Sequence, residues 1–158
     1  MAAMAATGKI VGMIGMLAFR DPAEPEIRFG LRIFLGLLYG VAGLFHVVKP
    51  APFLTIMPHW VPQPEAVILI TGLCEIAGAV AILFIPRLHA AAGLALALYA
   101  VCVYPANINH AMLDHFGGPH ALGLWYHVPR LLLQPVLVWA ALYAGALIKW
   151  PFSSYLRF

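Results

Sequence analysis

The chain has 158 residues, of which 63% are hydrophobic and only 9% are charged, and its mean hydropathy is +0.92. Soluble domains carry roughly 25% charged residues, so this composition excludes an ordinary water-soluble domain and indicates a membrane protein. The formal net charge is +3, but the basic residues are scattered and form no patch, which argues against a nucleic-acid partner.

Residues 1–28 are expected to form a cytoplasmic or interfacial tail. The apolar stretch between Lys9 and Arg20 is only about ten residues long, whereas roughly 17 to 25 residues are needed to cross the hydrocarbon core. A signal peptide is the alternative, but the positive charge comes late and no small-residue cleavage site follows. At the other end, residues 151–158 are expected to form a cytoplasmic tail.

Four apolar runs follow the N-terminal tail. They cover residues 30–48, 66–85, 90–104 and 128–148. The prolines at positions 50, 86 and 105 are predicted to end the first three helices, because proline interrupts a helix. Small residues recur along each run, with a GxxxG pattern in the first, and allow close helix packing in lipid. The sequence therefore predicts an all-α fold, an integral membrane antiparallel four-helix bundle over residues 29–150.

The basic residues also predict how this bundle is oriented. With four crossings both termini lie on the same side of the membrane, and that side collects every lysine and arginine except Lys49 and Arg130. Cytoplasmic loops are enriched in these residues. We therefore expect both termini to be cytoplasmic, in the cytoplasmic (inner) membrane of a bacterium, with the lipid bilayer as the main partner.

Ionisable and amide side chains within the apolar runs identify a candidate pocket, because such groups are costly in lipid and usually face the bundle interior. Glu75 lies near the middle of the second run, and Arg130 and Gln134 share one face of the fourth. We expect a ladder from Glu75 through Gln134 to Arg130. His46 and Asn107 lie at the same end of the first and third runs. The predicted pocket residues are His46, Glu75, Asn107, Arg130 and Gln134, and no catalytic residue is assigned.

Metal and haem motifs are weak in this sequence. His110 and Asp114 have an i, i+4 spacing that suits zinc or copper if the segment is helical. A Gly-Gly-Pro sequence breaks any helix shortly after them, so they stay weak candidates and no metal site is assigned. Nothing in the spacing of His46 and His127 demands a bis-histidine haem.

Four segments of the chain resemble a known family. The sequences FHVVKPAPFLTIMPHWVPQP, TGLCEIAGAVAIL, YPANI and PRLLLQPVLVWA are similar to those of the DoxX-like family of small bacterial membrane proteins, whose relatives include the small subunit of a thiosulfate:quinone oxidoreductase. The resemblance covers about residues 31–144. The family pattern maps onto His46, Pro50, Phe53, Pro58, Pro62, Gly72, Glu75, Pro105, Ala106, Asn107, Arg130, Gln134 and Trp139.

The chain also departs from that pattern. Leu132 occupies a position where the family commonly has proline, and a proline stands at Pro135 instead. The histidine-containing segment 110–127 lies outside the family pattern, so any metal site there would belong to this chain alone.

Three functions are consistent with the sequence. The first is a quinone-linked or small-molecule-linked redox accessory subunit, in which Glu75 accepts a proton and Arg130 holds an anionic or quinone oxygen; the cofactor stays undetermined beyond this. The second is a membrane scaffold or assembly partner, with a partner protein or as a homo-oligomer, in which the polar residues only hold the helices together. The third is a small transporter, which would need an oligomer to form a pore.

Overall fold

The computed structural model describes residues 26–116 and 122–149, in which all regular secondary structure is helical. The long helices are α2 (Glu26–Val48), α4 (Pro64–Phe84), α5 (His89–Phe116) and α6 (Leu124–Ala144). A short helix, α3 (Ala51–Leu54), follows α2, and the 3₁₀ turn η1 (Pro86–Leu88) joins α4 to α5. The predicted all-α class is confirmed. The two predicted tails lie almost entirely outside the described residues.

Three of these helices are long and apolar enough to cross a membrane, namely α2, α4 and the segment Pro86–Phe116 that contains α5. The helix α6 is not among them, and it carries His127, Arg130 and Gln134 in its first half. The membrane character expected from the composition is therefore supported by three helices, and a fourth crossing by α6 is a proposal.

The helix boundaries follow the prolines in two of three cases. The helix α2 ends at Val48, before Pro50, and α4 ends at Phe84, before Pro86. The prediction that Pro105 ends the third helix is wrong, because α5 continues through Pro105 to Phe116. Proline removes one backbone donor, a loss that membrane helices tolerate when neighbouring groups satisfy the freed carbonyl.

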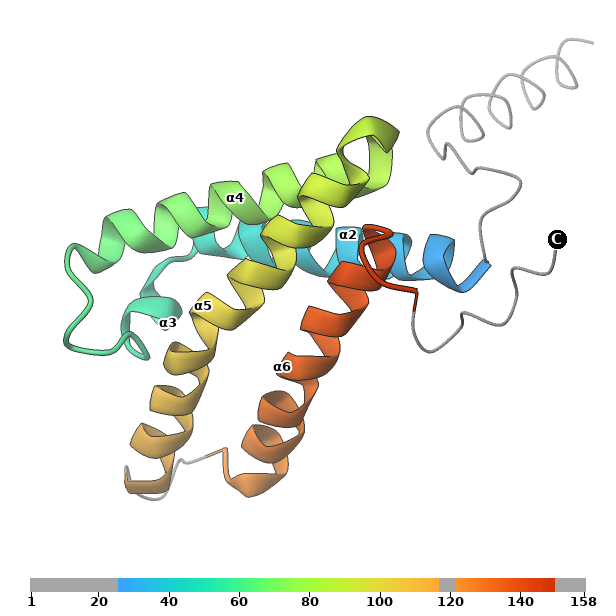
Figure 1. Ribbon diagram of the computed structural model, residues 1–158. Helices are drawn as coiled ribbons and strands as arrows, with labels where there is room; N and C mark the ends of the chain where they lie inside the picture. Colours follow the sequence, from blue (N-terminus) through green and yellow to red (C-terminus); the bar gives the residue numbers. More distant parts are fainter. Residues whose placement is uncertain (1–25, 117–121, 150–158) are drawn as a thin grey trace, which may run out of the picture.

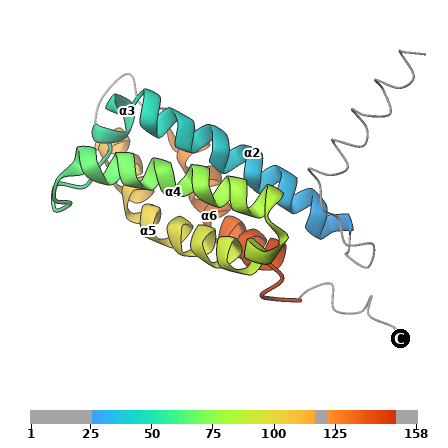
Figure 2. The same cartoon turned by 90° about the horizontal axis from the view of Figure 1, so that it is seen from above.

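The four long helices form two antiparallel hairpins. In Figures 1 and 2, α2 and α4 lie side by side, and α5 and α6 form a second pair that runs obliquely across the first. The two hairpins are joined at the N-terminal end of α2, where Nε of Arg28 donates to the Tyr143 carbonyl and Nε of Arg32 to the Ala144 carbonyl, both at 2.9 Å. These arginines donate to carbonyls of the last turn of α6, where the negative end of the helix dipole favours cations.

Glycines set the close approach within each hairpin. A Cβ added at Gly43 of α2 would lie 2.6 Å from the Gly72 carbonyl oxygen of α4. In the second hairpin, a Cβ added at Gly93 would lie 2.6 Å from the Ala141 carbonyl oxygen. Small residues therefore bring the helix backbones together, as membrane helices require because lipid gives them no hydrophobic reason to associate.

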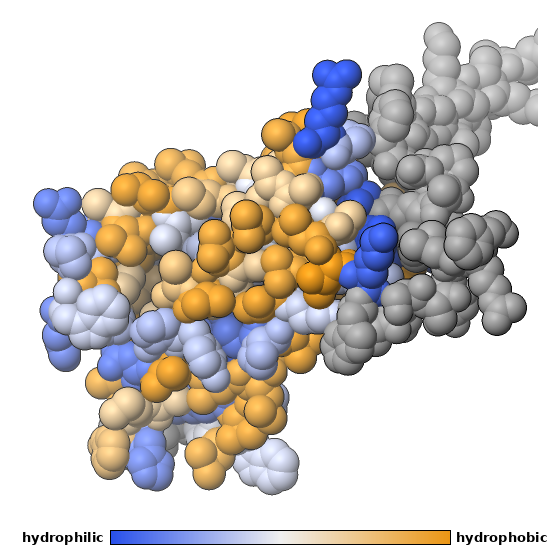
Figure 3. Space-filling model, in the orientation of Figure 1, coloured by the Kyte–Doolittle hydropathy of each residue, from blue (hydrophilic) through white to orange (hydrophobic). Residues whose placement is uncertain are grey.

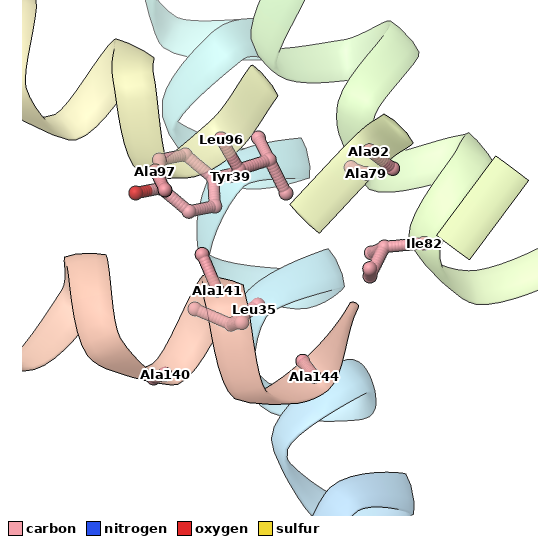
Figure 4. Close-up of a cluster of buried hydrophobic side chains, with 10 residues drawn as sticks. All are labelled: Leu35, Tyr39, Ala79, Ile82, Ala92, Leu96, Ala97, Ala140, Ala141 and Ala144. Carbon is pink, nitrogen blue, oxygen red and sulfur yellow. The ribbon is translucent and has the colours of Figure 1, made fainter. Parts of the chain in front are cut away.

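The core and the surface differ from those of a soluble protein. A cluster of buried side chains, most of them alanines, lies where the two hairpins cross: Leu35, Tyr39, Ala79, Ile82, Ala92, Leu96, Ala97, Ala140, Ala141 and Ala144 (Figure 4). Large apolar side chains instead point outward, and Leu37, Leu98 and Leu132 are 61%, 57% and 66% exposed. Figure 3 shows that apolar residues cover much of one face. Such a surface fits lipid and not water.

Candidate functional site

A cavity of about 450 Å³ lies between the two hairpins. It is bounded by the second half of α2, the first half of α4, the second half of α5 and the first half of α6, while the segment from α3 to Val61 closes one side. Its walls are mainly aliphatic and aromatic. All five residues that the sequence singled out line it: His46, Glu75, Asn107, Arg130 and Gln134.

Glu75 is the most enclosed ionisable group of the cavity, with 3% of its surface exposed. It faces inward from α4, and Nδ1 of His46 on α2 is hydrogen-bonded to its Oε2 atom. The Tyr99 side chain of α5 also lines the cavity and lies close enough to this carboxylate to interact with it electrostatically. The buried acid of α4 thus has neighbours from two other helices, α2 and α5. The close approach of α2 and α4 at Gly43 brings His46 within reach of the carboxylate.

Two tyrosines extend this polar group. The rings of Tyr39 and Tyr99 pack edge to face with centroids 5.8 Å apart. The Tyr39 hydroxyl is buried and has no hydrogen-bond partner among the described residues. An unsatisfied buried hydroxyl is costly, so this oxygen is available to a molecule that enters the cavity.

The opposite wall carries amides and a guanidinium. Nδ2 of Asn107 donates to Oε1 of Gln134 at 3.0 Å, and Nη2 of Arg130 donates to Oδ1 of Asn107. Nε2 of Gln134 donates to the Ala100 carbonyl of α5. Asn107 therefore bridges the arginine and the glutamine, and Arg130 faces the cavity with a full positive charge.

The predicted ladder from Glu75 through Gln134 to Arg130 differs from the bonds observed. Glu75 is hydrogen-bonded to His46, whereas Gln134 is bonded to Asn107 and to the Ala100 carbonyl of α5. The reason is the hairpin packing. Glycine contacts hold α4 close to α2 and α6 close to α5. The nearest polar partner of Glu75 is therefore on α2, and the nearest partners of Gln134 are on α5, while the cavity separates Glu75 from Gln134.

The segment after α2 covers one side of the cavity. Phe53 and Trp60 both line the cavity, and the Phe53 ring lies 3.8 Å from the His46 ring between centroids. Nδ2 of Asn109 donates to the Ile56 carbonyl at 2.9 Å and ties this segment to α5. The covering segment is therefore fixed to the same helix that supplies Asn107.

A second polar cluster lies next to the cavity, near the α5–α6 connection. Nε2 of His127 donates to Oδ2 of Asp114 at 2.8 Å, and Nη1 of Arg130 donates to Nδ1 of His110, also at 2.8 Å. The two weak metal candidates, His110 and Asp114, thus meet at this place with His127. The two histidines considered for haem are hydrogen-bonded to different carboxylates, His46 to Glu75 and His127 to Asp114.

Sequence reasoning missed Tyr99 as a partner of the buried acid. The residue stands in the middle of an apolar run, where a tyrosine is common and its hydroxyl is the only signal of a polar role. Only the packing of α5 against α4 brings this side chain close to Glu75.

In the described residues the chain is helical, three of its helices are long and apolar enough to cross a membrane, and polar side chains are grouped in one cavity between them. Residues 35–144 match the family described as Domain of unknown function (DUF8561), and the chain belongs to this family. No curated protein and no solved structure matches the chain.

The family match corrects the resemblance to DoxX-like proteins, since the chain matches a different family and no DoxX family. The four segments that suggested the resemblance are short. Most of their residues are apolar, and the prolines and polar residues that mark them also occur in membrane helices of unrelated families.

Proposed function

We propose that this chain is an integral membrane protein that binds a quinone, or a lipid-soluble molecule with a quinone-like head group, in the cavity between its hairpins. The observation that carries the proposal is an apolar cavity with the His46 and Glu75 pair on one wall and the Arg130 guanidinium on another. This role suits an accessory subunit of a quinone-linked redox system.

The size and walls of the cavity support a ligand of this class. Small-molecule pockets commonly measure about 300 to 1,000 Å³ and have apolar walls with a few well-placed polar groups. The cavity, at about 450 Å³, has that size and that lining. It also opens among helices with lipid-facing outer surfaces, so a ligand dissolved in the bilayer could enter without crossing water.

The polar groups support a head with two oxygens. A quinone carbonyl accepts hydrogen bonds, and Arg130 has more N–H groups than its bonds to His110 and Asn107 use. On the other side, the His46 and Glu75 pair and the free Tyr39 hydroxyl can exchange hydrogen bonds with a second oxygen. We propose the Glu75 carboxylate, which is hydrogen-bonded to His46, as the group that exchanges a proton with the head group.

The orientation of the protein is part of the proposal. We propose that α6 is a fourth crossing, because it packs along α5 and is tied to α2 by Arg28 and Arg32. The cavity then lies in the outer half of the bilayer and both termini face the cytoplasm of a bacterium.

The test is a binding measurement on the purified protein in nanodiscs. A short-tailed ubiquinone analogue should quench tryptophan fluorescence in a saturable manner, because Trp60 lines the cavity. Glu75→Gln and Arg130→Gln should each weaken binding by on the order of tenfold, equivalent to about 1.4 kcal/mol. The matched controls are Glu65→Gln and Arg87→Gln, which change exposed side chains and should bind as the unaltered protein does.

Lack of saturable quenching by the ubiquinone analogue and by a menaquinone analogue would refute the proposal. The scaffold function is the second candidate, favoured by the bonds that Asn107, Arg130 and Gln134 make with one another. In that case Glu75→Gln and Arg130→Gln would lower the stability of the protein, no quinone analogue would bind, and a defined partner protein would be recovered with it.

A further inference from the structure

Three side chains with metal-binding atoms converge near the α5–α6 connection, and neither the family nor the proposed quinone site accounts for them. They are His110 and Asp114 of α5 and His127 of α6, and one ligand atom from each lies within 4.8 Å of the others. We propose that these residues bind a divalent transition-metal ion of the zinc class.

The geometry is close to that of a metal site. Ligand atoms bonded to tetrahedral zinc at about 2.0 to 2.2 Å are roughly 3.3 to 3.6 Å apart, so the three atoms, which lie within 4.8 Å of one another, need to close by at most about 1.5 Å. The rings of His110 and His127 lie 4.9 Å apart between centroids at 79°, and they come from different helices. Two imidazoles and a carboxylate form a ligand set that suits Zn²⁺ and Co²⁺.

The burial of His127 separates this cluster from an ordinary group of surface side chains. His127 is 3% exposed, and its Nδ1 atom has no hydrogen-bond partner among the described residues. Its Nε2–H group donates a hydrogen bond to Oδ2 of Asp114, since a carboxylate only accepts. A metal ion can take the place of that proton, and the proton can move to the unpartnered Nδ1, so binding needs no extra charge on the ring.

Arg130 opposes metal binding and gives the proposal a distinctive consequence. An arginine only donates, so its contact with Nδ1 of His110 shows that this nitrogen carries a lone pair. That lone pair is available to a metal once the guanidinium moves away. Arg130 then keeps its bond to Asn107 and its position over the Tyr126 ring, 5.4 Å from the centroid. The metal and Arg130 therefore compete for His110.

The test uses Co²⁺ as a spectroscopic probe, added to the purified full-length protein in detergent with no histidine tag. Tetrahedral Co²⁺ with histidine and carboxylate ligands absorbs in the visible range, so a saturable band with a stoichiometry of one Co²⁺ per chain is expected. Zn²⁺ should remove the band. Asp114→Asn and His127→Gln should each weaken binding by on the order of tenfold or more.

The matched control is His115→Ala, which removes an exposed histidine from the same helix one residue after Asp114 and should leave the Co²⁺ band unchanged. Arg130→Gln should bind Co²⁺ more tightly than the unaltered protein, because the competing cation is gone. Circular dichroism of each variant verifies that it is folded. Absence of a saturable band in the unaltered protein, or a band that Asp114→Asn leaves intact, would overturn the proposal.

Discussion

Replacing Gly43 by alanine should separate α2 from α4 and disturb the acid in the cavity. The added Cβ would lie 2.6 Å from the Gly72 carbonyl oxygen and 2.9 Å from the Glu75 Cβ, whereas ordinary contacts begin at 3.4 Å. The two backbones would have to separate by about 0.8 Å. Overpacking of this kind costs about 1 to 3 kcal/mol, which exceeds the gain of about 1 kcal/mol that alanine brings to a helix.

The matched control for Gly43→Ala is Gly30→Ala, in the same helix. A Cβ at Gly30 meets nothing within 4 Å, so this variant should gain helix stability or stay unchanged. Unfolding in detergent by SDS titration, followed by circular dichroism, measures both variants. Gly43→Ala should also weaken binding of the quinone analogue, because His46 and Glu75 come from the two helices that move apart. Equal stability of the two variants would refute the role given to the glycine contact.

Three further predictions concern other parts of the molecule. Arg32→Met should lower the free energy of unfolding by about 2 kcal/mol, because the bond to the Ala144 carbonyl of α6 is lost. Binding of the quinone analogue should stay unchanged, and a full loss of binding would contradict the role of this arginine as a tie between α2 and α6. A double-mutant cycle of Asn107→Leu and Gln134→Leu should give a coupling of about 0.6 kcal/mol by SDS unfolding, and none if their bond is absent in the membrane. In a cysteine-free background, an impermeant thiol reagent should label Glu65→Cys in intact cells and Arg87→Cys only after lysis; the reverse pattern would invert the proposed orientation.

The sequence identified the polar residues of the cavity but not their bonds. An acid or an arginine within an apolar run stands out because it is costly in lipid, and the five predicted residues do line one cavity. Which residue meets which depends on how closely the helices approach and at what angle they cross. Neither quantity can be derived from helical spacing, so Glu75 was expected to meet Gln134 and instead meets His46.

The helix ends likewise depend both on prolines, which the sequence shows, and on helix packing, which it does not. Pro50 and Pro86 stand where the chain also turns, and the helices end before them. Pro105 stands where α5 packs against α6, and there the helix continues. Packing against a neighbouring helix can therefore keep a helix continuous through a proline, and the proline alone does not predict where the helix ends.

The position of the cavity follows from where the hairpins are joined. Near the N-terminal end of α2, Arg28 and Arg32 hold α6 against α2, and the alanine-rich cluster fills the space between the hairpins. Because the second hairpin crosses the first obliquely (Figure 1), the pairs diverge toward the other end of α2, beyond Tyr39. Small side chains cannot fill the wider space there. The chain instead places His46 and Glu75 on one side and Arg130 on the other, so the divergence that leaves a cavity also exposes its polar groups to a ligand.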